Sequence, residues 1–331
     1  MIMEKSDLRI VYMGTPDFAV EGLRVLVEGG YNVVGVVTMP DKPVGRHGNT
    51  LQASPVKQYA VEHGLLVMQP EKLKSPGFVE QLRGLNADLQ IVVAFRMLPE
   101  VVWGMPRLGT FNAHASLLPK YRGAAPINWA VINGEKETGM TTFMLRHEID
   151  TGDIIEQVRI PIGEKDNVEV VHDRLMTLSG QMVISAVDKM IEGTLETISQ
   201  DELLKRQKEA NPLLTDEELL APAPKIFRDT CMIDWRQPVA KVYDFVRGLS
   251  PYPAAWTTLE GKSVKILETE KEIVSHDDEP GAIVTDGKKY IKVACVDGYL
   301  DVKTIQVEGK KRMSVEDLLR GFRLPENARF E

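Results

Sequence analysis

Strand and helix patterns alternate along the first 160 residues, and this alternation constrains the fold more than any other feature of the sequence. The apolar run Leu8–Met13 predicts a strand, and Tyr31–Thr38 predicts the next one. Between them, Thr15 is a good helix N-cap and Pro16 suits the first helical position. The mostly apolar segment Leu89–Ala94 is typical of a strand buried in a parallel sheet. The alternation predicts a three-layer, Rossmann-like α/β domain.

The first strand–helix–strand unit lacks the glycine fingerprint of dinucleotide-binding proteins. In Gly14-Thr15-Pro16, a proline stands where that fingerprint needs a glycine to approach a pyrophosphate. Asp41 could serve as the acid that binds a ribose in a dehydrogenase. Because Pro16 removes the phosphate-binding turn, the sequence argues against a dehydrogenase.

The pattern changes in the C-terminal third of the chain. A long helix is predicted over residues 166–192, and the polar, proline-containing passage 207–225 predicts a linker. After a short helix predicted at Val239–Leu249, short strands are separated by Asp-Gly turns, which are typical of hairpins. We therefore predict an N-terminal domain over residues 1–206 and a C-terminal domain with an OB-like β-barrel over residues 226–331.

The composition is that of an ordinary globular protein. Of the 331 residues, 43% are hydrophobic and 27% are charged, and no apolar run is long enough to span a membrane. The two cysteines, Cys231 and Cys295, have no metal-binding spacing and are expected to be small buried hydrophobes. With no apolar signal segment at residues 1–7, we expect a cytoplasmic protein.

The charge of the chain argues mildly against a broad nucleic-acid-binding surface. The formal net charge is −8, and residues 211–331 carry 18 basic and 21 acidic side chains. Neither half of the chain is therefore basic. Any contact with a nucleic acid must come from local groups of cations and should depend on salt concentration.

Three polar side chains alternate at the predicted end of a strand. In the segment from Thr110 to Pro119, Asn112, His114 and Ser116 are separated by one residue each. Alternate side chains of an extended chain share a face, so these three are expected to project to one side. An amide donor beside a titratable imidazole is suited to acyl transfer, in which an oxyanion is stabilised and a proton is moved.

A carboxylate is predicted near these groups. Asp150 follows the apolar run Met140–Leu145, which predicts a strand, and lies in the turn Asp150-Thr151-Gly152-Asp153. A carboxylate in that position could orient the imidazole of His114. The same four residues are also good turn formers by themselves, so a purely structural role for Asp150 remains open.

These residues together resemble the folate-dependent formyltransferases. The resemblance rests on Asn112-x-His114-x-Ser116-Leu117-Leu118-Pro119, Tyr121-Arg122-Gly123, Pro126, Asn133-Gly134-Glu135, Thr138-Gly139 and Asp150-Thr151-Gly152. The segment Pro40–Arg46, followed by Ser54–Lys57, favours the branch of that family that formylates methionyl-tRNA. With the C-terminal domain included, the resemblance covers nearly the whole chain.

The resemblance implies a donor, an acceptor and three catalytic residues. The donor is 10-formyltetrahydrofolate, with no metal required, and the acceptor is the α-amino group of methionine on initiator tRNA, the reaction that prepares this tRNA for translation initiation. Asn112 and His114 would stabilise a tetrahedral intermediate, and Asp150 would assist proton transfer. The resemblance also implies that residues 1–206 are the catalytic, folate-binding domain and that residues 226–331 bind tRNA.

Further residues are implied to bind the two substrates. Ser116, Leu117, Leu118 and Pro119 look like the turn that contacts folate, and Phe95 and Arg96 are expected at the same cleft. Arg96 stands where relatives commonly have glycine, which leaves its effect on the folate pocket open. For tRNA, the expected contacts are Arg46 and Lys42 in one loop and Lys288 and Lys289 in the C-terminal domain, although a plain charged surface explains the last two almost as well.

Two other functions are kept as alternatives. The first is formylation of an amino sugar nucleotide by another branch of the same family, although no feature of the sequence supplies a pocket for a nucleoside diphosphate. The hydrolase part of formyltetrahydrofolate dehydrogenase is a further branch. The second alternative is a non-catalytic tRNA- or folate-binding protein, against which the presence of Asn112, His114 and Asp150 argues. No obligate protein partner and no membrane partner are evident from the sequence.

Overall fold

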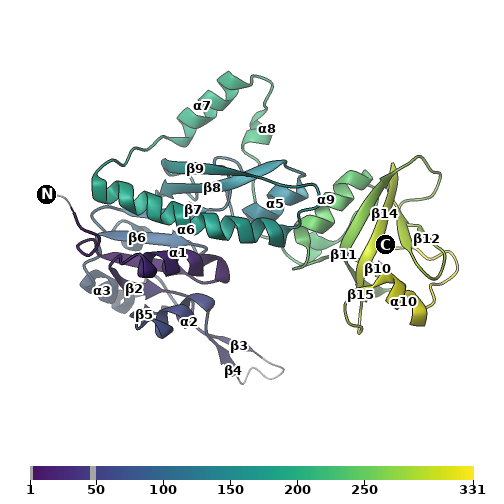
Figure 1. The fold of residues 1–331 in the computed structure, drawn as a ribbon, viewed down its shortest axis with the longest axis horizontal. Coiled ribbons are helices and arrows are strands. Elements are labelled where there is room, and N and C mark those ends of the chain that lie inside the picture. Colours follow the sequence, from purple (N-terminus) through teal and green to yellow (C-terminus); the bar gives the residue numbers. More distant parts are fainter. Residues whose placement is uncertain (1–2, 45–49) are drawn as a thin grey trace. The chain divides into compact units, whose positions relative to one another are not determined.

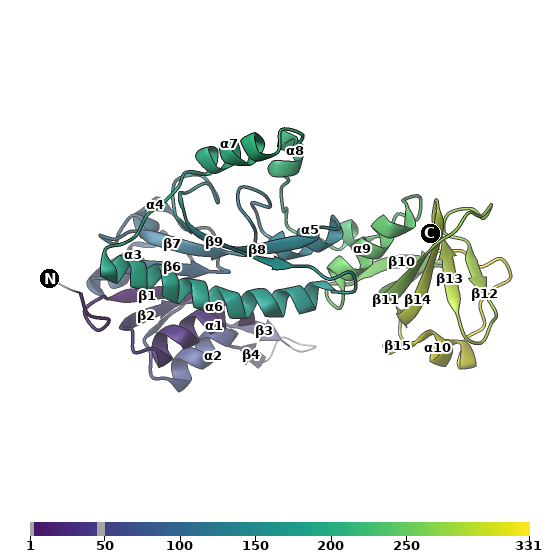
Figure 2. The same cartoon turned by 45° about the horizontal axis from the view of Figure 1, so that its top comes forward.

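The structure is a computed structural model that describes residues 3–44 and 50–331. The chain forms two compact units, drawn in Figures 1 and 2. The first comprises residues 1–123, 139–160 and 172–222, and the second comprises residues 124–138, 161–171 and 223–331. Both units therefore contain segments that are distant in sequence.

The first unit contains a seven-stranded sheet in the order β5-β2-β1-β6-β7-β8-β9. Strands β5, β2, β1, β6 and β7 run parallel to one another, and β8 is antiparallel to β7. The strands are β1 (Ile10–Gly14), β2 (Val33–Val37), β5 (Val67–Met68), β6 (Leu89–Val93), β7 (Thr110–His114), β8 (Glu137–Met144) and β9 (Ile154–Pro161). The predicted buried strand is confirmed as β6, all five residues of which are buried.

Helices cover one face of the sheet through apolar side chains of alternate strand residues. Val11 and Met13 of β1 pack with Phe78 and Leu82 of α3 (Pro76–Gly84) and with Val102 of α4 (Glu100–Trp103). Because side chains alternate along a strand, Tyr12 points to the opposite face. Helices α3 and α4 therefore form one outer layer of the α/β unit.

The opposite face carries α1 (Asp17–Glu28), α2 (Pro55–Glu62) and α6 (Val168–Glu192). The Tyr12 hydroxyl donates a 2.5 Å hydrogen bond to the carbonyl oxygen of Ala19 in α1. Glycine at position 180 lets α6 lie close to α1, since a Cβ there would come within 2.9 Å of Glu21 Cγ. Figures 1 and 2 both show α1 and α6 side by side. The predicted three-layer α/β fold is thus confirmed.

Two local predictions around the helices were wrong or incomplete. The N-cap of α1 is Pro16 and not Thr15, and the buried Thr15 hydroxyl has no hydrogen-bond partner among the residues that the structure describes. The polar residues after α6 form α7 (Gln200–Ala210) and α8 (Asp216–Leu219), whose N-caps are Ser199 and Thr215. These helices were not predicted because their sequences carry few apolar residues. They occupy part of the predicted linker, 207–225.

The second unit contains an antiparallel sheet in the order β10-β11-β14-β13-β12, with β15 paired to β14. The predicted hairpins and the short helix at Val239–Leu249 are confirmed. Its strands are β10 (Ala255–Leu259), β11 (Lys262–Ile273), β12 (Ile283–Thr285), β13 (Ile291–Ala294), β14 (Gly298–Val307) and β15 (Met313–Ser314), and its helices are α5 (Pro126–Ile132), α9 (Val239–Leu249), α10 (Val315–Gly321) and the 3₁₀ turn η1 (Asp229–Cys231). The fold class, an α/β unit joined to an antiparallel β unit, is as predicted.

No described helix is long and apolar enough to cross a membrane.

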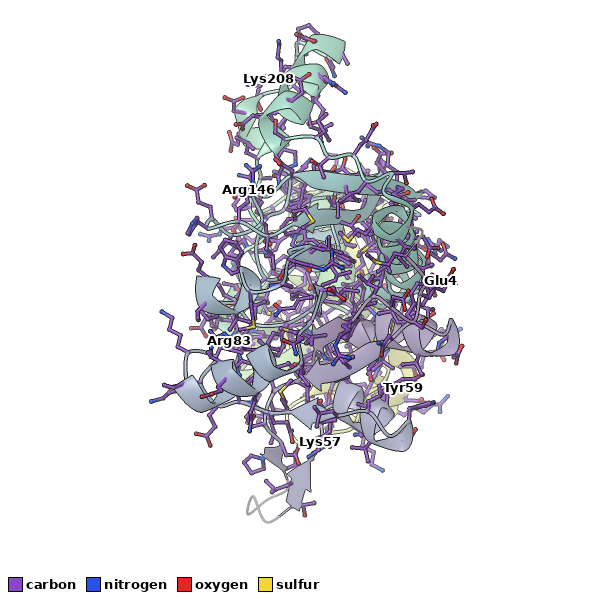
Figure 3. All side chains as sticks on the ribbon, turned by 90° about the vertical axis from the view of Figure 1, so that its left-hand side faces the viewer. Glu4, Lys57, Tyr59, Arg83, Arg146 and Lys208 are labelled. Atoms are coloured by element: carbon purple, nitrogen blue, oxygen red, sulfur yellow. The ribbon has the colours of Figure 1, made fainter. Side chains whose placement is uncertain are left out.

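A small antiparallel ribbon, β3 (Lys42–Val44) and β4 (Thr50–Gln52), extends from the first unit and was not predicted as strands. Asp41 at its base accepts a 2.7 Å hydrogen bond from Lys57, which is labelled in Figure 3, and another of 2.7 Å from Gln69. These bonds, the one from Lys57 first, lower the pKa of Asp41. Asp41 therefore anchors the ribbon.

Candidate functional site

The candidate site lies at the carboxyl ends of β1, β6 and β7. In the order β5-β2-β1-β6-β7 the chain winds in opposite directions from β1 and from β6, and α/β proteins bind ligands at such a point. Among the described residues, four buried polar atoms without a hydrogen-bond partner lie on or next to these strands: Gln90 Nε2 near the start of β6, and Thr15 Oγ1, Arg96 Nε and Asn112 Oδ1 further toward the carboxyl ends. Buried polar atoms are normally paired, so this concentration points to a missing partner such as a ligand.

His114 is the last residue of β7 and is 7% exposed. Its Nε2 lies 2.9 Å from the carbonyl oxygen of Tyr121, and because a carbonyl can only accept, Nε2 carries the hydrogen. Its Nδ1 faces Asp150 Oδ2 at 4.0 Å, which is too long for a direct hydrogen bond. Nδ1 is therefore the ring nitrogen available to a third group, next to a carboxylate.

Asp150 is held in an unusual backbone conformation. It is 8% exposed, and its φ of +54° lies in the left-handed region that residues other than glycine seldom adopt. Its Oδ2 accepts a 3.0 Å hydrogen bond from the backbone N–H of Gly123. A Cβ at Gly152 would overlap the carbonyl oxygen of Met144, so this turn requires glycine there. The predicted proximity of Asp150 to His114 is found in the structure.

Gln200 and Arg122 are two further residues of this region that the sequence analysis did not identify. The buried Gln200 donates to the carbonyl oxygens of Asp150 (2.7 Å) and Gly152 (3.0 Å). Arg122 in turn donates to Gln200 Oε1. Nothing in the sequence around Gln200 indicates a contact 50 residues away. The Arg122 side chain stands within the motif that carried the resemblance.

The turn after β7, predicted to bind folate, is fixed by its own protein contacts. The Ser116 hydroxyl donates to the carbonyl oxygen of Lys120 at 2.7 Å. Leu118, joined to Pro119 by a cis peptide bond, is fully buried. Leu117 is half-buried, whereas Ser116 and Pro119 are buried. Ser116 and Leu118 therefore stabilise the turn through contacts with the protein. Leu117 and the backbone are the groups that remain able to contact a ligand.

Thr141 of β8 holds this turn in place and was also missed. Its hydroxyl donates to Ser116 O at 2.6 Å and accepts from Leu118 N at 3.2 Å. The side chain of Gln157 in β9 adds hydrogen bonds to Thr141 Oγ1 (2.9 Å) and to Leu118 O (2.7 Å). A threonine in an apolar strand gives no sequence signal of such a role, because its partners come from other strands.

Phe95 and Arg96 follow β6, as predicted, and each side chain contacts other parts of the protein. Phe95 packs against the apolar cluster beneath α3 and α4. Arg96 donates to the carbonyl oxygens of Pro70 and Glu71, and its burial lowers its pKa. Ala94, exposed at the end of β6, has a φ of +46°. The backbone at this strand end is thus strained, as is common at functional sites.

Three of the four residues predicted to contact tRNA are described by the structure, and they are exposed. Lys42 is exposed in β3, whereas Arg46 lies outside the described residues. Lys288 and Lys289 are exposed in the turn between β12 and β13, where their backbone N–H groups donate to Asp286 Oδ1 at 2.9 and 2.7 Å. None of the three described lysines forms an ion pair with another described residue. Their ammonium groups are free to bind an anion.

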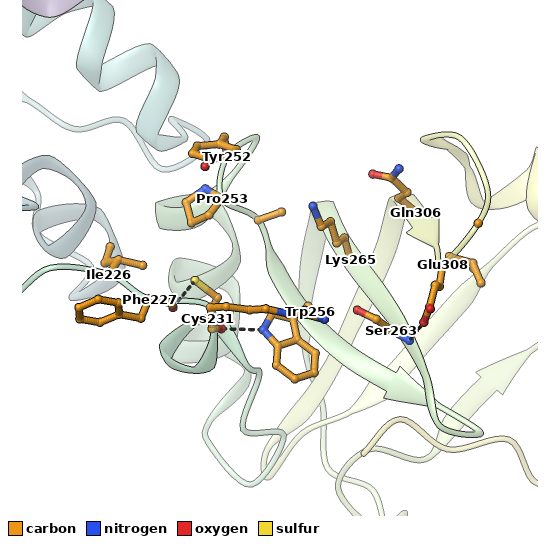
Figure 4. A pocket seen from close by; sticks show the side chains of 14 residues that line it. Ile226, Phe227, Cys231, Tyr252, Pro253, Trp256, Ser263, Lys265, Gln306 and Glu308 are labelled. Atoms are coloured by element: carbon orange, nitrogen blue, oxygen red, sulfur yellow. Dashed lines mark hydrogen bonds between the residues drawn. The ribbon is translucent and has the colours of Figure 1, made fainter. Parts of the chain in front are cut away.

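The second unit carries a groove of about 570 Å³, drawn in Figure 4. Its lining includes the aromatic residues Phe227, Tyr252 and Trp256 and the basic residues Arg228 and Lys265. The Arg228 guanidinium lies 5.4 Å from the centre of the Trp256 ring, and Trp256 Nε1 donates to Arg228 O at 2.7 Å. Neither cation has an acidic ion-pair partner within residues 3–44 and 50–331. Phe227 and Tyr252 are largely exposed.

Within the described part of the chain, no group of three or more His, Cys, Asp and Glu side chains is arranged to hold a metal ion. Cys231 and Cys295 are free thiols and both are buried, as predicted. Burial raises the pKa of Cys231 and raises that of Cys295 to about 12, so both remain protonated at neutral pH. Buried, protonated thiols are poor nucleophiles.

The chain is an α/β protein in which an imidazole and a carboxylate, those of His114 and Asp150, lie together at a strand end, and comparisons with known proteins identify its family. Residues 8–187 match the model of a formyl transferase family, and residues 225–323 match that of the formyl transferase C-terminal domain. The chain therefore belongs to the formyl transferase family.

Individual relatives narrow this assignment. The chain is 63% identical to the methionyl-tRNA formyltransferase of Bacteroides fragilis over 98% of both chains. It is 64% identical to the protein of the same name from Bacteroides thetaiotaomicron over 97% of this chain and 98% of that one. This chain is a formyl-transferring enzyme, as predicted.

Solved structures share the fold. WlaRD, a sugar 3N-formyl transferase crystallised in the presence of dTDP and 5-N-formyl-THF, matches with a TM-score of 0.64 and 16% identity, over 92% of this chain and 99% of that one. At this identity the likeness concerns the fold alone. The family assignment rests on the sequence relatives and the two family models.

Proposed function

We propose that this enzyme transfers the formyl group of 10-formyltetrahydrofolate to the α-amino group of methionine on initiator tRNA. The observation that carries the proposal is the pairing of His114 with Asp150, each buried and each held by backbone from the 121–123 segment. Relatives at 63 and 64% identity named methionyl-tRNA formyltransferase support this acceptor. We further propose that the enzyme acts in the cytoplasm.

Each of the three residues has a separate role in the proposed reaction. The Asn112 amide stabilises the oxygen that becomes negatively charged when the amine attacks the formyl carbon. His114 takes part through Nδ1, the ring nitrogen that makes no hydrogen bond to another described residue. In the imidazolium form Nδ1 donates to this oxygen, and in the neutral form it accepts the proton released by the attacking amine and passes it to the departing folate nitrogen. Asp150 orients the imidazole and assists the proton transfer. The 4.0 Å separation is expected to shorten when substrate is bound, as is common for catalytic pairs.

The folate is proposed to bind beside the turn of residues 116–119 and the end of β6. Neither Asn112 Oδ1 nor Arg96 Nε has a hydrogen-bond partner among the described residues. The first can accept from an N–H of a pterin or an amine, and the second can donate to an oxygen or ring nitrogen of the folate. Because Ser116 and Leu118 are held by protein contacts, we assign them to the support of the turn and assign the direct contact to Leu117 and backbone groups. Phe95 supplies part of the apolar base.

For tRNA, we propose two contact regions. The first is the ribbon of β3 and β4 with Lys42, together with Arg46, which lies between these strands in the sequence. The second is the C-terminal unit with Lys288, Lys289 and the groove. Aromatic rings beside free cations are the combination that binds unpaired bases and their phosphates. Residues 226–331 would thus act as the tRNA-binding part, and residues 1–206 as the catalytic part.

A truncation at the proposed linker, residues 207–225, is a poor test of this division. Residues 124–138 belong to the same compact unit as residues 223–331, and a Cβ at Gly248 of α9 would lie 2.6 Å from the side chain of Ile132 in α5. Removing α9 would therefore uncover part of the remaining chain. Point variants of exposed lysines test the tRNA contact more directly.

The catalytic assignment is tested by Asn112→Ala, His114→Ala and Asp150→Ala. Each is expected to lower kcat by roughly 100- to 1,000-fold, the usual effect of losing one such group. His63 and Asp153 provide matched controls, because both are partnered residues outside this group of three. Steady-state kinetics with circular dichroism distinguish lost chemistry from lost folding. Wild-type turnover in a folded variant would remove that residue from the mechanism.

A further inference from the structure

Gln200 is a buried amide whose entire hydrogen-bonding capacity is used within the candidate site. It is 3% exposed. Its two N–H groups donate to Asp150 O at 2.7 Å and to Gly152 O at 3.0 Å. Its oxygen accepts from Arg122 Nε at 3.1 Å and from Arg122 Nη2 at 2.6 Å. An amide offers two donors and two lone pairs, so all four are satisfied.

These four bonds hold the turn that carries the carboxylate. Asp150 is in the left-handed region, a conformation that costs an aspartate free energy and persists only when its surroundings impose it. Gln200 binds the carbonyl on each side of Thr151 and so fixes both ends of this turn. Arg122 binds Gln200, and its neighbour Gly123 donates to the Asp150 carboxylate at 3.0 Å. The Gln200 amide thus links the backbone of Asp150 to Arg122, whose neighbour Gly123 binds the Asp150 carboxylate.

The position of Gln200 is itself set by neighbouring backbone. Ile198 and Ile154 exchange two antiparallel hydrogen bonds, of 2.8 and 2.9 Å. Ser199 then caps α7 by accepting from Glu202 N at 3.2 Å. The bridge brings the chain beside the end of the Asp150 turn, and the helix begins at Gln200. The amide is therefore presented by a fixed backbone.

We infer that Gln200 is a positioning residue for the transfer reaction, anchored by Arg122 and acting through Asp150. The inference rests on the proposed role of Asp150. Gln200 fixes the distance and direction from the carboxylate to His114 Nδ1 and touches neither substrate. Because misplacement of a catalytic group by about 1 Å can cost about 100-fold in rate, loss of this amide should lower kcat more than it raises KM.

The test uses Gln200→Met and Gln200→Glu in the full-length enzyme. Methionine keeps the length but removes all four bonds. Glutamate keeps the contact with Arg122 as an ion pair but, when ionised, has no donor for the two carbonyls, so it tests the same point if the methionine variant folds poorly. Gln207→Met, on the same helix, is the matched control, since Gln207 Oε1 has no hydrogen-bond partner within residues 3–44 and 50–331 and its side chain belongs to no proposed site.

We expect a 10- to 100-fold loss of kcat in both Gln200 variants, KM values for folate and methionyl-tRNA within about threefold of wild type, and no change in Gln207→Met. Combined with Asp150→Asn, the Gln200→Met change should add less than threefold, because two residues acting as one unit are not additive. Wild-type kcat in a folded Gln200→Glu variant, or a fully multiplicative double variant, would overturn the inference alone. Wild-type kcat in Asp150→Asn would overturn it together with the proposed role of Asp150.

Discussion

Neighbouring threonines in β8 allow one chemical change to be made at two positions with opposite expected results. Thr141 and Thr142 are both completely buried. Thr141 Oγ1 has three hydrogen bonds, to Ser116 O, from Leu118 N and from Gln157 Nε2. Thr142 Oγ1 has no hydrogen-bond partner in the described part of the chain. Valine has nearly the shape of threonine, so each substitution changes the hydrogen bonding and little else.

The expected magnitudes follow from these contacts. Thr141→Val leaves a buried carbonyl and a buried N–H unpaired, and deprives Gln157 of one bond while it keeps Leu118 O. At about 1–3 kcal/mol for each buried group left unpaired, we expect a loss of about 3 kcal/mol in the free energy of unfolding. For a domain of this size, this corresponds to a decrease in Tm of about 6–12 °C. Thr142→Val removes an unpaired hydroxyl and should be neutral or stabilising by up to about 1 kcal/mol.

Calorimetry of the two variants and the wild type measures the difference. The Thr141→Val variant should also raise KM for the folate donor, because the hydroxyl fixes the 116–119 turn, whereas Thr142→Val should leave KM unchanged. Equal decreases in Tm for the two variants would refute the reasoning, since the hydrogen bonds assigned to Thr141 would then contribute nothing. A destabilised Thr141→Val with normal folate KM would separate the turn from folate binding.

Three further predictions concern other parts of the molecule. Burial raises the pKa of Cys295 from 9.0 to about 12, so above pH 9 the unfolded chain releases this proton while the folded chain retains it. The free energy of unfolding should therefore fall as pH rises toward 12, by up to about 1.4 kcal/mol per pH unit. Between pH 8 and 10.5, urea unfolding should show a smaller decrease for Cys295→Ala than for the wild type, and equal decreases would contradict this. The double variant Lys288→Ala/Lys289→Ala should weaken transfer to tRNA without altering the KM for folate. It should also lower the slope of log affinity for tRNA against log salt concentration by about 2. An equal weakening of tRNA and folate binding would contradict this prediction. Gly152→Ala should abolish transfer or folding, because a Cβ there would overlap the carbonyl oxygen of Met144. In the control Gly84→Ala, the Cβ would meet open space, and Tm should change by less than about 2 °C. Normal activity of Gly152→Ala would show that the Asp150 turn can relax.

Much of the fold could be predicted because its signals are local. Apolar runs such as Leu89–Val93 and the residues of Val239–Leu249 specify a buried strand and an amphipathic helix whatever their neighbours are. The meeting of His114 and Asp150 was predictable for the same reason, since each follows a recognisable strand. Helix α7 was missed because a polar helix has no apolar period to detect.

The rest of the site depends on contacts between distant residues. Gln200 reaches carbonyl groups about 50 positions earlier in the chain, and Thr141 binds a turn of another strand. Nothing in the residues next to Gln200 or Thr141 encodes these partners. Arg96 shows the same limit, because its position at a strand end was predictable but its contacts with Pro70 and Glu71 were not.

The most direct test of the proposed function is a transfer assay with 10-formyltetrahydrofolate labelled in the formyl group. The wild-type enzyme and Asp150→Asn would each be offered methionyl-tRNA or a dTDP-linked amino sugar under the same conditions. We expect label on the methionine of the tRNA with the wild-type enzyme, none on the sugar nucleotide, and a loss of at least about 100-fold with Asp150→Asn. Label on the sugar nucleotide in place of the tRNA would contradict the proposed acceptor, and undiminished transfer by Asp150→Asn would contradict the proposed mechanism.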